Sequence, residues 1–240
     1  MTTPDPAVNA ASALRGDFRS FLYLVWKHCN LPDPTAIQYD IAKFMQRGPK
    51  RRMVKAFRGV GKSWIAAAYV LWRLYNNPQL NILVVSANKQ RSDAFTTFCQ
   101  RLILEMPLLA HLKARSDQRW SMVAFDVGPA LPSQSPSVMS VGVYGNATGM
   151  RADIIVPDDI EVANNSETLG QREKLAERVK EFDAILKPDG EVLYLGTDQT
   201  EESVYRQLPA RGYTVRIWPI RYPDEKQRAA YDGALAPWID

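Results

Sequence analysis

The stretch Ala56-Phe-Arg-Gly-Val-Gly-Lys-Ser63 decides the fold of this 240-residue chain. It matches the phosphate-binding P-loop pattern G-x-x-x-x-G-K-[ST] except at its first position, where alanine replaces glycine. Gly59 and Gly61 let backbone N–H groups converge on phosphate oxygens, and a helix after the loop would turn its positive end toward them. Lys62 supplies a charge for the β- and γ-phosphates of ATP, and Ser63 supplies a hydroxyl ligand for Mg²⁺.

The surroundings of this loop favour a P-loop over the plain alternative, a glycine-rich turn with a surface lysine. Residues 53–57 have the composition of a short strand, and residues 62–75 form an amphipathic helical pattern that ends at Asn76-Asn-Pro78. A strand before the loop and a helix after it are the setting that a P-loop requires.

Strand and helix patterns alternate through the rest of the chain, which predicts an α/β fold with a mostly parallel β-sheet flanked by helices. Together with the P-loop, this indicates a RecA-like P-loop NTPase of the ASCE type. Residues 107–150 are rich in turns and predict only short strands near 123–126 and 138–144. The other helices are expected at 17–29, 35–46, 90–105 and 171–187, and the other strands at 81–86, 153–156, 191–195 and 213–218.

A second motif lies where the run Ile154-Ile-Val-Pro-Asp158-Asp159 ends in two carboxylates. This is what a Walker B element needs: Asp158 would hold Mg²⁺, and Asp159 would polarise the attacking water. Glu161 could take the second role if the strand ends later. Pro157 suggests that the strand is already leaving the sheet. An acidic turn after a strand is the alternative, which the presence of a P-loop disfavours.

Composition excludes several classes of protein. Hydrophobic residues make up 46% and charged residues 23%, as in ordinary globular proteins, and no run of 18 apolar residues predicts a membrane span. The two cysteines and two histidines have no zinc-site spacing, which favours a reducing, cytosolic compartment. The net charge of +4 is compatible with a polyanionic partner, and a basic cluster leads into the P-loop: Lys50, Arg51, Arg52, Lys55 and Arg58.

With these motifs placed, the chain resembles the large subunit of viral DNA-packaging terminases, and most closely the DNA maturase B proteins of short-tailed phages. The likeness runs through nearly the whole chain. It departs from the family pattern at Asp198, where a proline is expected, and at Asp159, where glutamate is more common. Besides the P-loop, the stretches that carry it are Phe125-Asp-Val-Gly-Pro-Ala130, Thr148-Gly-Met-Arg-Ala-Asp-Ile-Ile155, Gln171-Arg-Glu-Lys174, Tyr194-Leu-Gly-Thr-Asp-Gln-Thr200 and Trp218-Pro.

The resemblance implies a motor ATPase that drives double-stranded DNA through a portal protein into a procapsid, in the cytoplasm of an infected bacterium and with no membrane partner. It implies a small terminase subunit as partner and a homo-oligomeric ring, generally of five subunits. Such proteins usually carry a nuclease domain behind the ATPase. We therefore expect an N-terminal helical arm (1–34), a P-loop ATPase domain (35–220) and the start of a linker (221–240), without nuclease activity in this chain.

The resemblance also implies roles for three residues outside the core of the two motifs. Gln38, preceded by Leu31-Pro-Asp-Pro34, resembles the glutamine that reads the adenine edge, although Thr35 and Gln38 also form a capping-box pattern. Arg58 occupies a loop position where terminases often keep an arginine, with plain surface charge as the alternative. Thr197 resembles a coupling residue that senses the γ-phosphate, with a simple strand-to-loop turn as the alternative.

Ring motors of this type generally need an arginine from a neighbouring subunit. The candidate is Arg151, between Gly149 and the Walker B strand; pairing with Asp153 and contact with DNA are the alternatives. Arg172 and Arg178 are the reserves.

The complete set of expected catalytic residues is Lys62, Asp158, Asp159, Arg58, Arg151 and Thr197. The expected nucleotide site is Gln38, Arg58, Gly59, Val60, Gly61, Lys62, Ser63 and Trp64, with Ser63 and Asp158 on Mg²⁺.

Three other functions compete with a DNA-translocating ATPase. A helicase-like, nucleic-acid-dependent ATPase would share the order of Gln38, Lys62, Asp158 and Thr197 but needs a second RecA-like domain. A small-molecule kinase needs an acceptor pocket and a basic lid, for which the sequence has no signature. A non-catalytic DNA-binding module would rest on the basic cluster at 50–58 alone.

Overall fold

The computed structural model describes residues 12–147, 149–199, 202–231 and 233–237. The first residues of the expected arm and the last of the expected linker lie outside this described part, as do Thr148 and Thr200 of the quoted motifs.

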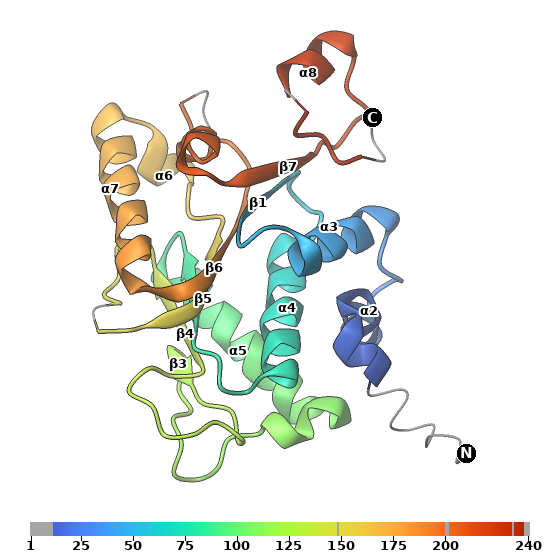
Figure 1. Cartoon of the computed structure of the whole chain (residues 1–240), viewed down its shortest axis with the longest axis vertical. Coiled ribbons are helices and arrows are strands. Elements are labelled where there is room, and N and C mark those ends of the chain that lie inside the picture. Colours follow the sequence, from blue (N-terminus) through green and yellow to red (C-terminus); the bar gives the residue numbers. More distant parts are fainter. Residues whose placement is uncertain (1–11, 148, 200–201, 232, 238–240) are drawn as a thin grey trace.

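The described residues form one seven-stranded sheet in the order β3-β4-β2-β5-β6-β1-β7 (Figure 1). All neighbouring strands are parallel except β3, which pairs with β4 in the antiparallel sense. The expected α/β fold with a mostly parallel sheet is confirmed. The strands are β1 (Arg51–Ala56), β2 (Ile82–Ser86), β3 (Ala124–Phe125), β4 (Val138–Gly142), β5 (Ala152–Asp158), β6 (Leu186–Gly196) and β7 (Thr214–Trp218).

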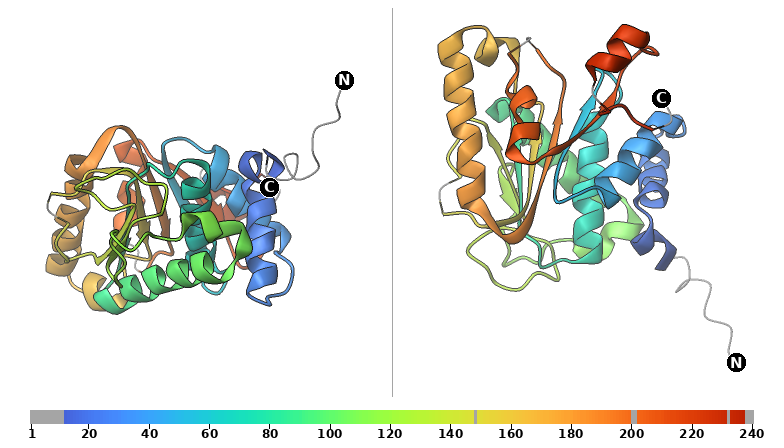
Figure 2. Two further views of the ribbon diagram at one scale, coloured as in Figure 1. Left: turned by 90° about the horizontal axis from the view of Figure 1, so that it is seen from below. Right: turned by 45° about the horizontal axis from the view of Figure 1, so that its top comes forward.

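Helices cover both faces of this sheet, with α4 and α7 on opposite sides (Figure 2). Successive strand residues point to opposite faces, so Val54 packs toward α4 while its neighbour Met53 packs toward α7. The longer helices are α2 (Phe18–His28), α3 (Ala36–Arg47), α4 (Lys62–Asn76), α5 (Lys89–Glu105) and α7 (Leu169–Ile185). The shorter ones are η1 (Pro107–Leu112), α6 (Ala163–Ser166), η2 (Val204–Gln207), η3 (Pro209–Arg211) and α8 (Glu225–Ala230).

Side-chain caps explain where the first helices begin. Asp17 accepts a hydrogen bond from the Arg19 N–H at the start of α2, and Thr35 closes a capping box with Gln38 at the start of α3. The expected arm packs closely on the domain, because the Phe18 ring lies 5.3 Å from that of Tyr69 on α4. The division at residues 34/35 stays a prediction.

The chain beyond β7 turns back onto the sheet. The Ile217 N–H donates to the Ala234 carbonyl, and the Ala236 N–H donates to the Ile217 carbonyl. Ala236 is fully buried. The described residues of the expected linker therefore pack more closely than a loose connection would, and the boundary at residue 221 stays a prediction.

Pro157 remains inside the sheet, so the expectation that the strand is already leaving it there was wrong. β5 pairs with β2 without interruption from Ile154 to Asp158, with Pro157 opposite Val85. Pairing with β6 occurs at Ile155 and again at Asp158. Because proline lacks an N–H, it removes a ladder bond toward one neighbour while the other neighbour still holds the strand.

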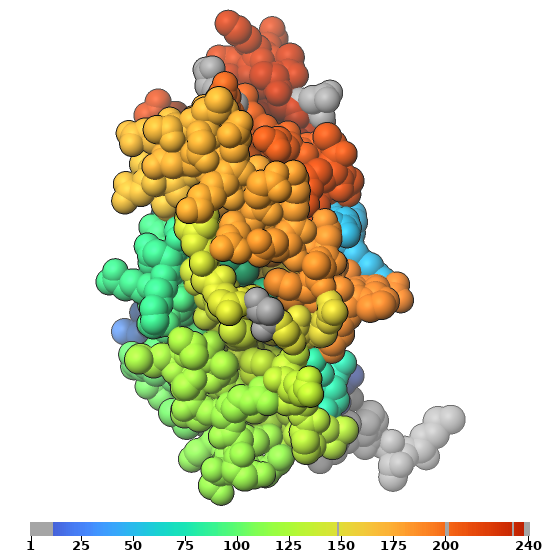
Figure 3. All heavy atoms as spheres, turned by 90° about the vertical axis from the view of Figure 1, so that its left-hand side faces the viewer, coloured from blue at the N-terminus to red at the C-terminus, as the bar shows by residue number. Residues whose placement is uncertain are grey.

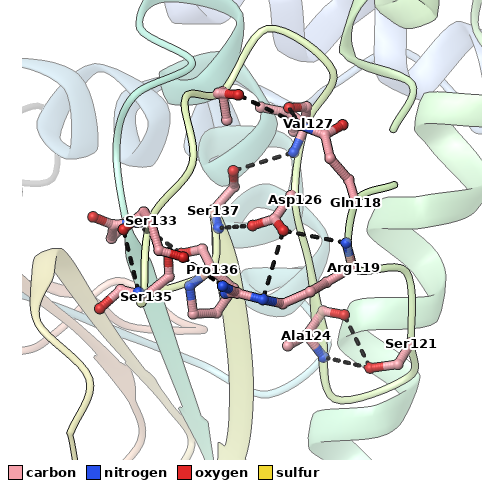
Figure 4. Close-up of polar contacts among 12 residues, drawn as sticks. Gln118, Arg119, Ser121, Ala124, Asp126, Val127, Ser133, Ser135, Pro136 and Ser137 are labelled. Atoms are coloured by element: carbon pink, nitrogen blue, oxygen red, sulfur yellow. Dashed lines mark hydrogen bonds and ion pairs between the residues drawn. The ribbon is translucent and has the colours of Figure 1, made fainter. Parts of the chain in front are cut away.

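The turn-rich stretch between η1 and β4 is ordered by Asp126 (Figure 4). Its Oδ1 accepts from the Ser137 N–H at 3.1 Å, and its Oδ2 accepts from the Arg119 N–H at 3.2 Å. Gln118 Nε2 donates to the Val127 carbonyl at 3.0 Å. These bonds fix the short strands β3 and β4 that the sequence predicted. Figure 3 shows this stretch below α7 on the same side of the molecule.

No helix in the described part of the chain combines the length and the apolar character needed to cross a bilayer.

Candidate active site

The P-loop joins the end of β1 to the start of α4. Gly59 and Gly61 have φ angles of +90° and +84°, a backbone conformation that other residues rarely adopt. Gly61 is the residue directly before α4, so the free N–H groups of the first helical turn face the loop. The two glycines therefore give the loop the curvature that an anion-binding cradle needs.

Lys62 is a buried cation whose hydrogen bonds all go to uncharged oxygens. Its Nζ donates to the Ala56 and Phe57 carbonyls at 3.0 and 3.3 Å and to Thr197 Oγ1 at 3.0 Å. The nearest oxygen of Asp159 is 4.0 Å away. Burial lowers the pKa of Lys62, which the Asp159 and Asp158 carboxylates only partly oppose. An additional anion at this point would stabilise the charged amine.

Asp158 ends β5 beside the end of β2, where it pairs with Ser86. Burial raises the pKa of its carboxyl group to about 6, although the Ser63 hydroxyl donates a hydrogen bond to it. Its Oδ1 is buried and has no hydrogen-bond partner among the described residues. A partnerless carboxylate oxygen beside a hydroxyl fits Mg²⁺, which prefers oxygen ligands and takes few of them from the protein.

Asp159 and Glu161 differ in how they are engaged. Asp159 has a positive φ of 45°, its N–H donates to the Leu195 carbonyl, and its side chain is 31% exposed. Glu161 is buried; it accepts from Ser203 Oγ and the Val204 N–H, both at 2.8 Å. The carboxylate of Asp159 is therefore the available one, while that of Glu161 joins two loops.

Thr197, Gln38 and Arg58 all contact the P-loop or the segment beside it. Thr197 Oγ1 donates to the Ala56 carbonyl at 2.7 Å and accepts from Lys62. Gln38 Nε2 donates to the Val60 carbonyl at 2.9 Å, while its Oε1 serves the capping box. Arg58 Nη2 donates to Gln199 Oε1 at 2.5 Å. Gln38 thus combines its capping contact with a position against the P-loop.

Arg151 lies at the other end of β5 from Asp158. Its backbone N–H donates to Ser135 Oγ at 3.0 Å, and its guanidinium donates to the Ala184 carbonyl. The alternative of a pair with Asp153 was wrong, because Asp153 Oδ2 pairs with Lys187 Nζ at 2.9 Å. A whole strand separates Arg151 from the site in its own chain.

The reserve arginines are both engaged elsewhere. Arg172 donates to the Ser166 carbonyl at 3.0 Å and pairs with Glu202, and Arg178 pairs with Glu181 at 2.9 Å.

A cavity of about 430 Å³ beside the P-loop brings together part of the expected site, while Gln38, Val60, Ser63, Arg151, Asp158 and Thr197 are not among its lining residues. Three lining residues were missed by sequence reasoning: Arg91, which follows the end of β2, Val162, which follows the end of β5, and Gln199, which follows Thr197. All three lie after the carboxyl ends of strands, which was the available signal. A larger cavity of about 730 Å³ lies between α7 and residues 141–151, away from the P-loop. The site cavity is lined by Arg58, Gly59, Gly61, Lys62, Trp64, Arg91, Asp159, Glu161, Val162 and Gln199.

Comparison with known proteins gives one close relative. No protein-family model matches the chain. The large terminase subunit of Enterobacteria phage T3 is 49% identical over 231 residues, which cover 94% of this chain and 39% of that protein. The chain thus spans about two fifths of the length of this relative.

Two solved structures match most of the chain. The large terminase ATPase domain of Thermus phage P74-26 is 16% identical, with a TM-score of 0.47, and the match covers 75% of this chain and 71% of that one. S. cerevisiae Dbp5 bound to Gle1 and IP6 is 12% identical, with a TM-score of 0.54, and the match covers 84% of this chain and 50% of that one. The second match supports the α/β fold.

Proposed function

Because this chain is a relative of phage large terminase subunits, 49% identical to that of phage T3 over 94% of its own length, we propose that it is the ATPase part of a DNA-packaging motor. It hydrolyses ATP to move double-stranded DNA into a procapsid. One observation carries the chemical part of this proposal. A poorly compensated Lys62 and a partnerless Asp158 oxygen meet beside the P-loop, where a phosphate and a divalent cation would complete both.

The residues of the site have separate roles in phosphoryl transfer to water. The P-loop amides and Lys62 bind the phosphates, and Gln38, whose amide contacts the Val60 carbonyl, reads the adenine edge when nucleotide binds. Ser63 and Asp158 would hold Mg²⁺, which neutralises charge on the phosphate oxygens. Asp159 orients the attacking water and accepts its proton. The water oxygen bonds to the γ-phosphorus, the bond from that phosphorus to the β–γ bridging oxygen breaks, and ADP leaves.

Two residues link this chemistry to movement. Thr197 touches both Lys62 and the Ala56 carbonyl, so a change at the γ-phosphate reaches the end of β6 through it. Arg58 exchanges its contact with Gln199 for a phosphate oxygen when nucleotide binds. This exchange replaces a neutral partner of Arg58 by an anion, which strengthens the bond.

Arg151 completes the site of a neighbouring subunit. Its place at the amino end of β5 keeps it from its own phosphates, so it can act on nucleotide only across an interface between subunits. We therefore propose a homo-oligomeric ring, of five subunits, that works on a portal protein and with a small terminase subunit. The place of action is the cytoplasm of an infected bacterium.

Phosphate release with and without double-stranded DNA tests the proposed activity. The chain alone should be monomeric and slow, and DNA together with procapsids should accelerate it. Lys62→Ala should stop release in both cases. A fast ATPase that stays monomeric and ignores DNA would exclude the packaging motor.

A mixing experiment tests the role of Arg151. Subunits with Arg151→Ala and subunits with Asp159→Asn should each be inactive, and mixed rings should recover part of the activity. Some interfaces in mixed rings pair an intact Asp159 with an intact Arg151. Absence of recovery in rings shown to be mixed would remove Arg151 from this role.

A further inference from the structure

The first turn of α5 lies beside the phosphate site although no motif marks it. β2 ends at Ser86, which pairs with Asp158 across the sheet. α5 begins at Lys89, and its cap residue Asn88 accepts from the Arg91 N–H at 3.0 Å. The fold therefore places Arg91 in the first helical turn after the strand that adjoins the Walker B strand.

Arg91 lines the same cavity as Lys62, Gly59 and Asp159. Within the described part of the chain its guanidinium makes no hydrogen bond and no ion pair, although its charge acts on the Asp158 carboxyl group. The neighbouring cation of the same turn behaves differently, because Lys89 pairs with Asp93. Arg91 is thus a cation that faces the site and lacks a fixed partner there.

The position of Arg91 at the start of α5 is electrostatically unfavourable with respect to the helix itself. The first turn of a helix is its positive end, where cations are unfavourable, and α5 has no acidic residue in that turn. The cavity also holds Arg58 and Lys62, so its three cations outnumber the two carboxylates that line it, Asp159 and Glu161. A phosphate would relieve this repulsion, and an arginine can donate two hydrogen bonds to it.

We propose that Arg91 binds the γ-phosphate of ATP and makes the site discriminate between triphosphate and diphosphate. This inference rests on the proposed ATPase function and adds a residue to it. The γ-phosphate is the specific target because Arg91 shares the cavity with Asp159, the residue proposed to orient the water that attacks this phosphate. The α- and β-phosphates lie over the P-loop amides instead.

Equilibrium binding of ADP and of a non-hydrolysable ATP analogue, both with Mg²⁺, tests the proposal on the whole chain. Arg91→Ala should weaken the triphosphate analogue by about 10-fold or more, the value expected for a lost charge-assisted bond, and ADP by less than about 2-fold. Arg91→Lys should recover part of the preference, since it restores the charge without the planar fork. Lys89→Ala is the matched control, because it removes a cation from the same turn outside the cavity.

The outcomes separate this inference from the function on which it rests. If the unmodified chain binds neither nucleotide, the proposed function fails. If it binds both and Arg91→Ala keeps the same triphosphate preference as Lys89→Ala, the inference is wrong and the function stands. If Arg91→Ala instead lowers only the affinity for double-stranded DNA and its dependence on salt, Arg91 binds the DNA backbone and the inference is again wrong.

Discussion

Two groups of buried charge lie at opposite ends of β1, and they are partnered in opposite ways. At the amino end, Arg52 is 1% exposed and donates to Glu191 at 2.9 Å, to the Tyr69 hydroxyl at 2.8 Å and to two carbonyls. Arg73 donates to the other oxygen of Glu191 at 2.8 Å. Of the Arg52 nitrogens, only Nε lacks a partner in the described chain. We call these residues the amino-edge cluster.

At the carboxyl end lies the carboxyl-edge cluster, Lys62, Asp158 and Asp159. Lys62 binds carbonyl and hydroxyl oxygens and stands 4.0 Å from the nearest oxygen of Asp159. One oxygen of Asp158 has no partner among the described residues. Because a buried charge costs free energy unless it is paired, the first cluster supports the fold and the second is completed only by a ligand.

Lys62→Met would sharpen this comparison most. We expect hydrolysis to fall by about 10³-fold, because Lys62 stabilises charge that develops on the transferred phosphate. The free energy of unfolding without nucleotide should stay the same or rise, since a poorly compensated buried cation is lost. Phosphate release and urea unfolding measure the two effects. A variant that unfolds much more easily would show that Lys62 supports the fold, and the two clusters would then not differ in this respect.

Arg52→Met is the converse change. It leaves Glu191 and the Tyr69 hydroxyl short of a partner, so we expect the free energy of unfolding to fall by about 3 kcal/mol. The folded fraction should hydrolyse ATP at the normal rate per molecule, because Arg52 lies at the far end of the strand. Urea unfolding gives the first value and release per folded molecule gives the second. Loss of turnover without loss of stability would contradict the assignment of Arg52 to the support of the fold.

A third prediction distinguishes the roles of the two carboxylates that follow β5, those of Asp159 and Glu161. Asp159→Asn should lower hydrolysis by about 10²-fold while nucleotide binding persists, because the attacking water loses its base. Glu161→Gln should instead lower the free energy of unfolding by about 1–2 kcal/mol, because a neutral amide oxygen replaces the charged acceptor of Ser203 and Val204. The amide NH₂ also cannot accept from the Gln199 N–H as the other carboxylate oxygen does. If Glu161→Gln stops turnover and Asp159→Asn does not, the two roles are reversed.

Sequence reasoning succeeded where local chemistry decides the structure. The glycines of the P-loop, the cap at Thr35 and the spacing within α4 each act over a few residues. It failed at Pro157, because the cost of a missing N–H depends on which neighbour it faces, and only the assembled sheet settles that. The order of the stretch after η1 likewise depends on Asp126 contacts that span about ten positions.

The site shows the same limit. Lys62 and Asp158 are marked by motifs, so the sequence could predict that they meet. Arg91 has no motif around it, and it reaches the cavity only because β2 lies beside β5 in the sheet. Arg151 follows a glycine-containing loop that suggested projection, yet only the strand direction shows that it lies at the edge away from its own Lys62.

Asp158→Asn also distinguishes the two clusters, through the dependence of stability on pH. Burial raises the pKa of Asp158 from 3.8 to about 6 in the folded chain. The folded state therefore binds this proton more tightly than the unfolded state does. Its contribution to stability is complete below pH 3.8 and is lost as the pH rises through about 6. In chelator and without nucleotide, Asp158→Asn should be more stable than the unmodified chain by about 2 kcal/mol at pH 7.

The stability that the amino-edge cluster contributes should depend on pH with the opposite sign. Burial alone would raise the pKa of Glu191, but Arg73 and Arg52 outweigh it and set that pKa below the ordinary value. Glu191 therefore stabilises the fold above its ordinary pKa of 4.5 and loses this effect as the pH falls further, the opposite sign to Asp158. Thermal unfolding from pH 4 to pH 8 should show the advantage of Asp158→Asn growing with pH. The advantage should shrink when Mg²⁺ and nucleotide are added, because they stabilise the chain that keeps the carboxylate more than the variant. An advantage that is constant with pH would mean that Asp158 is already compensated within the chain, and the distinction between the two clusters would fall.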